Sequence, residues 1–143
     1  MKRLVALDLQ EGFAPSADVD RISNDVVLGP VPFPEATFDA VSAFDFLEHI
    51  PRVLYRESGV EFPFIRLMNE VHRVLKPGGI FVAATPAFPR SGAFVDPTHV
   101  NFITRETVAY FSGERHAASL GYGFVGSFET VYCDWLPYTS AVW

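Results

Sequence analysis

Several features that mark well-known classes of protein are scarce in this sequence of 143 residues. Cys133 is the only cysteine, so an internal disulfide is excluded and a reducing, cytoplasmic location is expected. Lysine and arginine form no cluster and the formal net charge is −6, which argues against a nucleic-acid partner. The apolar run Leu4–Leu9 is interrupted by Asp8 and is too short for a signal peptide or a membrane span. We therefore expect a soluble protein with no nucleic-acid and no membrane partner.

What is abundant is apolar and aromatic. Hydrophobic residues make up 49% of the chain, which includes 14 phenylalanines, and this is a globular composition. The length suits a single domain, residues 1–143, with a core of its own. Histidines, the cysteine and carboxylates do not occur at the spacing of a metal site, so no metal is expected.

The clearest structural signal is the segment Phe62–Pro86. Pro63 suits the first position of a helix, and Pro77 with Gly78 and Gly79 ends it and reverses the chain. Apolar residues recur at helical spacing along one stripe, made of Phe64, Leu67, Met68, Val71, Val74 and Leu75. The segment therefore predicts a helix, a turn and then a strand.

The strand that follows, Ile80–Ala84, is apolar without alternation. Such a run is typical of a strand covered on both faces, as in a parallel sheet flanked by helices. We therefore expect an α/β fold.

Other elements are predicted with less local information. Asp45 is placed as the N-cap of a short helical piece, Phe46–Ile50. Further strands are predicted at Leu4–Leu9, Asp25–Leu28 and Thr37–Phe44, a helix from Thr104 to Phe111 with Val108 and Phe111 inward, and an antiparallel edge strand or hairpin at Phe124–Leu136. Loops are predicted at Gln10–Ser23, at Pro51–Glu61 with a turn at Ser58-Gly59, and at Ala87–Asn101, whose length favours a functional role.

Four blocks in fixed order resemble one family. They are VALDL (5–9), PVPFPEATFDAVSAFDFLEHIP (30–51), LMNEVHRVLKPGGIFVAATPAFP (67–89) and FVDPTHVNFIT (94–104). Together they resemble the class I S-adenosylmethionine-dependent methyltransferases, over most of the chain from Val5 to about Phe111. The resemblance implies a Rossmann-like methyltransferase fold, with a mostly parallel sheet, an antiparallel C-terminal edge and a reduced N-terminal part.

The resemblance also implies a cofactor site at the carboxyl ends of the strands. S-adenosylmethionine would be the methyl donor and S-adenosylhomocysteine the product, with no metal. The residues carried over to the cofactor are Asp8 for the ribose diol, Asn24 and Asp25 for the adenine amine, and Phe44, Asp45 and Phe46 for the methionine end. Asp8 and Asp25 have a plainer alternative as residues that cap turns.

For catalysis, His99 is the strongest candidate because it lies in the long loop beside the expected acceptor site. Asp96 could orient it. The plainer alternatives are a loop histidine bonded to backbone and an Asp-Pro-Thr turn. Glu48 and His49 are interpreted as the polar face of a helix.

One motif of the family is missing, namely its first glycine-rich loop. In one alignment LVALDL is the family's second strand, and the first strand with its loop is absent. In the other, LVALDLQEG is a degenerate first strand that retains Gly12. The loop to Asn24-Asp25 favours the first alignment, although losing the central strand would expose the edges of its neighbours.

The predicted function is therefore methyl transfer from S-adenosylmethionine to a small-molecule acceptor. The alternative is a non-catalytic, methyltransferase-like binding or assembly module that has lost normal cofactor binding. A nicotinamide-dependent Rossmann enzyme is a third and weaker alternative. A homo-oligomer is expected to cover the exposed strand edges.

Overall fold

The computed structural model describes residues 4–9, 18–113 and 117–136. The strands are β1 (Leu4–Asp8), β2 (Val19–Ser23), β3 (Phe38–Phe44), β4 (Leu54–Arg56), β5 (Gly59–Glu61) and β6 (Leu75–Ala84). The α-helices are α1 (Pro63–Val74), α2 (Gly92–Val95) and α3 (Ala117–Gly121), and the 3-10 helices are η1 (Leu47–His49) and η2 (Arg105–Tyr110). No helix in these ranges is long and apolar enough to cross a membrane.

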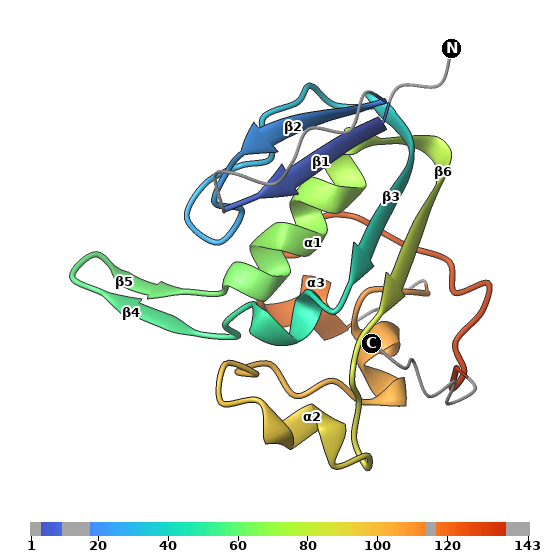
Figure 1. Ribbon diagram of the computed structural model, residues 1–143. Coiled ribbons are helices and arrows are strands. Elements are labelled where there is room, and N and C mark those ends of the chain that lie inside the picture. The colour runs from blue at the N-terminus through green and yellow to red at the C-terminus, as the bar shows by residue number, and fades with distance from the viewer. Residues whose placement is uncertain (1–3, 10–17, 114–116, 137–143) are drawn as a thin grey trace.

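The strands pair two by two. β1 pairs with β2 and β3 pairs with β6, both in parallel, while β4 and β5 form an antiparallel hairpin that projects from the body (Figure 1). The expected mixed α/β class with mostly parallel strands is confirmed. Over the described ranges, however, β1–β2 and β3–β6 remain separate sheets and do not form one continuous sheet.

Helix α1 follows the predicted boundaries closely. Pro63 occupies the start of the helix, which ends at Val74, and Leu75 is already extended. Gly78 has a φ of +76°, as the predicted reversal requires. At Gly79 a Cβ atom would lie 2.9 Å from the carbonyl oxygen of Lys76, so only glycine fits this bulged start of β6.

The prediction of a strand at Asp25–Leu28 is wrong, as is the prediction that Gln10–Ser23 is all loop. The second strand is β2, while residues 25–28 form a turn. Oδ1 of Asp25 accepts hydrogen bonds from the backbone N–H groups of Val27 (2.8 Å) and Leu28 (3.1 Å). This side-chain-to-backbone turn overrides the strand preference of two consecutive valines.

The predicted antiparallel strand at Phe124–Leu136 is also absent. Only an isolated parallel bridge joins Phe128 to Ser112. Phe124 belongs to the buried core cluster, and Phe128 packs against it. Gly126 lies so close to α1 that a Cβ atom on it would be 2.6 Å from the His72 ring. Close packing against α1 therefore replaces strand pairing in this segment.

Two further predictions are partly right. The turn at Ser58-Gly59 is present, with φ of +129° at Gly59, but it joins the short strands β4 and β5, which the sequence did not predict. Thr104 caps the helix that follows through a capping box with Thr107, although this helix, η2, is 3-10 rather than α. Its Phe111 is buried as expected, whereas Val108 is 40% exposed.

The core lies between α1, the segment around η1 and the segments that follow β6. The buried cluster consists of Leu47, Ile50, Phe64, Leu67, Met68, Val71, Leu75, Ile103, Phe111 and Phe124. Val41, Ala43 and Phe81 present the inner face of the β3–β6 pair to this cluster. The apolar stripe of α1 is thus the centre around which the remaining segments pack.

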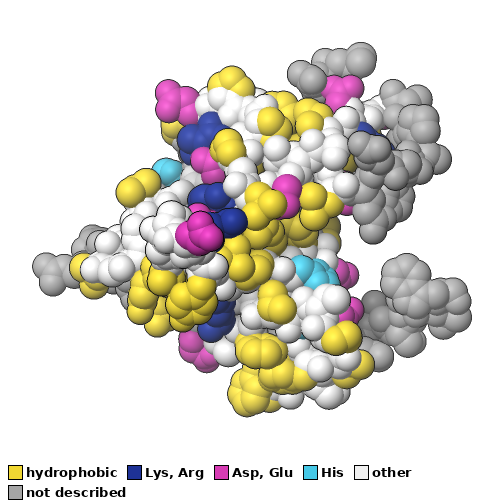
Figure 2. All heavy atoms as spheres, turned by 90° about the vertical axis from the view of Figure 1, so that its left-hand side faces the viewer, with side chains coloured by type: hydrophobic (Ala, Val, Ile, Leu, Met, Phe, Trp, Pro, Cys, Tyr) yellow, Lys and Arg dark blue, Asp and Glu magenta, His cyan; other side chains and the backbone are white. Residues whose placement is uncertain are grey.

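The outer face of the β3–β6 pair is uncovered, which corrects the prediction that Ile80–Ala84 is buried on both faces. Ile80 is 61% exposed, Val82 is 46% exposed and Phe44, at the end of β3, is 61% exposed. Ser42 pairs with Val82 and Phe44 with Ala84, so these side chains share one face of the pair. Exposed hydrophobic side chains also occur over much of the face shown in Figure 2.

The proline-rich segment before β3 is held to α1 by Glu70 and Arg73. Oε2 of Glu70 accepts a hydrogen bond from the backbone N–H of Val31 (2.8 Å). The Arg73 guanidinium donates to the carbonyls of Val31 (2.9 Å) and Phe33 (2.7 Å) and to both carboxylate oxygens of Glu70. Its hydrogen bonds hold the pKa of Glu70 below the ordinary value of 4.5, although partial burial opposes the shift.

This carboxylate predicts a loss of stability in acid. A carboxyl group whose pKa is lowered by folding contributes stability at pH values above its unfolded pKa and loses it as the pH falls below about 4.5. Replacing Glu70 by glutamine should flatten this part of the curve in urea denaturation from about pH 7 to about pH 3. The control is Glu61→Gln, since the Glu61–Arg56 pair is exposed and should contribute little. Equal acid sensitivity of the Glu70 variant and the native chain would contradict the assignment.

Candidate functional site

The carboxyl ends of β1 and β2 bring Asp8 and Asn24 together. Asp8 closes β1 and is exposed, and its carbonyl oxygen accepts a hydrogen bond from the backbone N–H of Asn24 (3.1 Å). Oδ1 of Asn24 is buried without a hydrogen-bond partner. A buried amide oxygen in this state costs free energy and would gain from a ligand that donates a hydrogen bond. Asp25 is less open to a ligand, because its Oδ1 already holds the following turn.

The end of β3 carries two exposed aromatic rings around a strained residue. Phe44 is 61% and Phe46 is 36% exposed. Asp45 lies between them with a φ of +46°, and its backbone N–H donates to the carbonyl of Ala84 (2.9 Å). The predicted role of Asp45 as N-cap is wrong, because Phe46 occupies that position and no side chain caps η1. A non-glycine residue at positive φ is uncommon and is often found at functional sites.

Beyond Phe46, helix η1 is fastened to the loop that contains DPTHVN. The carbonyl oxygen of Glu48 accepts hydrogen bonds from the backbone N–H groups of Val100 and Asn101, each at 2.9 Å. The Asn101 side chain is 1% exposed, donates to the carbonyl of Leu47 (3.0 Å) and accepts from Nε of Arg52 (2.5 Å). The two sequence blocks LEHIPR and DPTHVN are therefore the two sides of one interface.

Three side chains with metal-binding or acid–base chemistry meet at this interface. Glu48, His49 and His99 each offer one ligand atom, and these atoms all lie within 4.8 Å of one another. Nε2 of His99 lies 4.0 Å from Oε1 of Glu48, and the two imidazole rings pack edge to face with centroids 4.9 Å apart. Glu48 is 1% exposed and the His99 side chain is 8% exposed. Figure 2 shows histidine atoms at the surface with acidic side chains beside them.

Asp96 lies at the rim of this group. Its Oδ1 accepts hydrogen bonds from the backbone N–H (2.7 Å) and the hydroxyl (2.6 Å) of Thr98, and these bonds lower the pKa of Asp96. Its Oδ2 lies 3.9 Å from Nε2 of His99, which is ion-pair distance but too long for a hydrogen bond. Oδ1 of Asp96 therefore has the plainer role of a turn residue, whereas Oδ2 faces His99.

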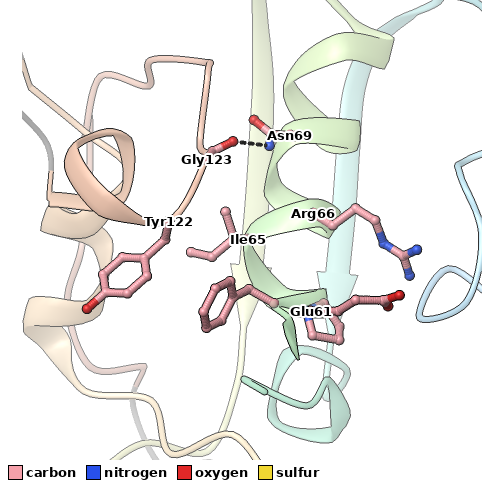
Figure 3. A pocket seen from close by; sticks show the side chains of 8 residues that line it. Glu61, Ile65, Arg66, Asn69, Tyr122 and Gly123 are labelled. Atoms are coloured by element: carbon pink, nitrogen blue, oxygen red, sulfur yellow. Dashed lines mark hydrogen bonds between the residues drawn. The ribbon is translucent and has the colours of Figure 1, made fainter. Parts of the chain in front are cut away.

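A separate hollow of about 340 Å³ lies at the start of α1 (Figure 3). Its lining consists of Glu61, Phe62, Pro63, Ile65, Arg66, Asn69, Tyr122 and Gly123. Tyr122 and Arg66 lie on opposite sides of Ile65, and Nδ2 of Asn69 donates to the carbonyl of Gly123 (2.9 Å). None of the predicted site residues lines it, so we do not place the site there.

One glycine pattern bears on the nicotinamide alternative. Gly121, Gly123 and Gly126 have the spacing G-x-G-x-x-G, which binds a dinucleotide when it joins a strand to a helix. Here the pattern begins at the last residue of helix α3 and continues without regular structure, and Phe124 within it is a core residue. The required context is missing, so this pattern does not support a dinucleotide site.

A family model described as a methyltransferase domain matches residues 1–83, more than half of the chain. The chain belongs to this methyltransferase domain family. The resemblance to the class I S-adenosylmethionine-dependent methyltransferases is thereby confirmed. No curated protein gives a significant match.

The strand pairing bears on the two alignments to this family. If LVALDL were the family's central first strand, it should pair on both sides. Within the described ranges β1 pairs with β2 alone, and β3 pairs with β6 alone. This pattern supports the alignment in which β1 is the family's second strand. Gly12, which the other alignment needs, lies outside the described residues.

The residues present fit parts of the expected cofactor. The buried, unpartnered Oδ1 of Asn24 suits an amine donor, and the exposed Asp8 carboxylate suits a ribose diol. Phe44 and Phe46 offer apolar surface at the end of the neighbouring sheet. The site residues therefore form two groups on two sheets, one around Asp8 and Asn24 and one from Phe44 to His99.

Two members of the second group were not predicted from the sequence. Glu48 and His49 were interpreted as a solvated helix face, whereas Glu48 is buried and His49 contacts the DPTHVN loop. The sequence signal that could have identified them is the presence of both LEHIP and DPTHVN in the chain. The two blocks form the two sides of one interface, so polar residues in one block suggest partners in the other.

Proposed function

We propose that this chain is an S-adenosylmethionine-dependent methyltransferase domain that acts on a small molecule. Family membership is the observation that carries the proposal. The scarcity of clustered basic residues, with a net charge of −6, disfavours a nucleic-acid acceptor. The carboxyl ends of β1 and β3, where such folds bind ligands, carry the polar and aromatic side chains described above.

In this proposal Asp8 accepts hydrogen bonds from the ribose hydroxyls, and Asn24 accepts one from the adenine amine. Asp25 contributes through its turn, which positions Asn24. Phe44 and Phe46 cover the methionine end, with Asp45 fixing the backbone between them. When bound, the cofactor supplies a methyl group on a positively charged sulfur, and the protein contributes mainly proximity and orientation.

Proton removal from a protonated acceptor would fall to His99, with Asp96 as its positioning residue. Their catalytic roles remain a prediction. His99 is largely buried and faces two carboxylates, so an acceptor would have to approach along the exposed side of Asp96. A general base must come within hydrogen-bond reach of the proton that it removes.

The direct test is isothermal titration calorimetry with S-adenosylmethionine and S-adenosylhomocysteine. We expect saturable heat with the native chain. In Asp8→Ala the affinity for the ligand should fall by about tenfold or more, because a bidentate carboxylate contact is lost. Asp20→Ala on β2 is the matched control and should bind as the native chain does. Absence of heat at about millimolar ligand, corresponding to less than about 4 kcal/mol of binding free energy, would refute cofactor binding.

A second candidate function is a non-catalytic binding or assembly module. The observation that favours it is the division of the parallel strands into two separate pairs, which leaves the cofactor residues on two sheets. Transfer of a labelled methyl group to any acceptor would refute this candidate. Absence of cofactor binding by a folded chain would support it.

We also propose that the chain self-associates. The uncovered outer face of β3–β6, with Ile80, Val82 and Phe44 exposed, supports this, because apolar patches of this kind often mark interfaces. Light scattering at micromolar concentration should give a mass above that of one chain. Replacing Ile80 and Val82 by threonine should lower that mass, whereas a monomeric native chain would refute the proposal.

A further inference from the structure

Glu48 and His49 have no role in the proposed methyl transfer, and together with His99 they form a cluster of potential metal ligands. Its three ligand atoms come from η1 and from the loop after α2, and they converge within 4.8 Å. The hydrogen bonds of each member show which of its atoms are free to bind a ligand.

The tautomers of both histidines follow from their partners. Nδ1 of His99 lies 3.3 Å from the carbonyl oxygen of Ala93, which can only accept, so Nδ1 carries the proton. Nδ1 of His49 faces the carbonyl (3.3 Å) and the hydroxyl (3.0 Å) of Thr98. Because that hydroxyl donates its proton to Asp96, Nδ1 of His49 must donate as well. In the neutral rings, both Nε2 atoms then carry free lone pairs.

Glu48 presents a further lone pair close to Nε2 of His99. Its Oε2 accepts a hydrogen bond from the Thr85 hydroxyl (2.7 Å), but its Oε1 is buried without any partner. That Oε1 lies 4.0 Å from Nε2 of His99, so two acceptors face each other with no donor between them. A buried carboxylate oxygen in this position is costly unless a cation or donor compensates it.

We propose that Glu48, His49 and His99 bind a divalent transition-metal ion, with Zn²⁺ as the first candidate. Two imidazole nitrogens and one carboxylate form a donor set that Zn²⁺ uses in catalytic sites, with the fourth position left open. The hydrogen bonds of Nδ1 to backbone carbonyls, and that of Thr85 to Glu48, are the outer contacts that orient such ligands. Oδ2 of Asp96, 3.9 Å from Nε2 of His99, adds negative charge at the rim.

Binding requires a modest contraction of the cluster. Ligands of a tetrahedral Zn²⁺ ion at bond lengths of about 2.0–2.1 Å lie roughly 3.4 Å apart, compared with the present limit of 4.8 Å. Side-chain rotation can supply this change, because His49 sits on a single 3-10 turn and His99 on a loop. With metal bound, His99 is a ligand and no longer a free base, so this role is distinct from the catalytic one proposed above.

The test is titration of the chelator-treated full chain with ZnCl₂, followed by calorimetry and by metal analysis after dialysis. We expect one Zn²⁺ per chain and a rise in melting temperature with metal concentration. His49→Gln and His99→Gln should each weaken the affinity by about 100-fold or more, since loss of an outer contact alone costs 10–100-fold. His72→Gln, on the exposed side of α1, is the matched control and should leave the affinity unchanged.

Glu48→Gln should also weaken the Zn²⁺ affinity, because it removes the carboxylate ligand. Glu48 is buried, so this variant could fail to fold; in that case the variant of the partly exposed His49 still decides the test. Absence of Zn²⁺ binding by the folded native chain would overturn the proposal. Binding that survives undiminished in both histidine variants, or that falls equally in the His72 variant, would overturn it too. The titration contains no S-adenosylmethionine, so its result is independent of cofactor binding.

Discussion

Replacing Phe124 by alanine is expected to lower the free energy of unfolding by about 3–5 kcal/mol. Phe124 is 2% exposed, and its ring packs against Phe111 (centroids 5.2 Å apart) and stacks with Phe128 (5.9 Å). Alanine would leave a cavity between α1 and the C-terminal segment, and the lost aromatic contacts add to the lost burial. Urea denaturation followed by far-ultraviolet circular dichroism measures the change.

The neighbouring Val125 provides the control, because its side chain is 88% exposed. Val125→Ala should change stability by less than about 0.5 kcal/mol. A loss below about 1 kcal/mol in Phe124→Ala would mean that residues 124–128 do not close the core as described.

Replacing Asn101 by alanine is expected to cost about 2–4 kcal/mol. The substitution leaves the buried Leu47 carbonyl without its donor, and it removes the acceptor for Nε of Arg52, which is exposed. Because this side chain is one of the contacts that hold η1 to the DPTHVN loop, the variant should also have a weaker Zn²⁺ affinity. Thermal denaturation and Zn²⁺ titration on the same sample measure both effects.

Asn69→Ala is the matched control. Asn69 also makes two hydrogen bonds to backbone, with Gly123 (2.9 Å) and Val125 (2.9 Å), but these bonds are exposed to water. Water can replace them, so we expect a smaller loss of about 0.5–1.5 kcal/mol and unchanged Zn²⁺ affinity. If the Asn101 variant were no less stable than the Asn69 variant, the interface between η1 and the loop would not depend on Asn101.

The parts of the fold that local sequence determines were predictable. Helix α1 was recognisable because Pro63, an apolar stripe and Pro77 define its start, face and end. β3 and the second half of β6, Ile80–Ala84, were recognisable as apolar runs of strand length, although β6 already begins at Leu75. The two glycines of the turn behave differently, since only Gly78 needs a positive φ while Gly79 avoids a clash.

One error occurred where a single side chain changes the local structure. Asp25 forms a turn through its carboxylate, although the two valines after it favour a strand. The prediction for Ile80–Ala84 was wrong for another reason, since apolar composition does not reveal which face a neighbour covers. A local hydrogen bond decides the first point, whereas tertiary packing decides the second, and the sequence of a strand does not show which segments pack against it.

The candidate site shows the same limit. His99 was predicted as a functional residue from its loop, and the structure places it beside Glu48 and Asp96. The prediction of no metal rested on the spacing of ligands along the chain. Ligands supplied by two distant segments show no such spacing, so a cluster like Glu48, His49 and His99 is found only in three dimensions.

The separate pairing of β1 with β2 has a consequence for local stability. None of the residues of this pair belongs to the buried core cluster, whereas β6 and α1 supply several of its members. Cooperative units with few buried contacts open at a lower free energy than the rest of the molecule. We therefore expect the pair that carries Asp8 to open more readily than α1 and β3–β6. A ligand that bridges Asp8 and Phe44 would hold two independently opening units together, and its affinity would be reduced by the free energy of ordering the weaker one.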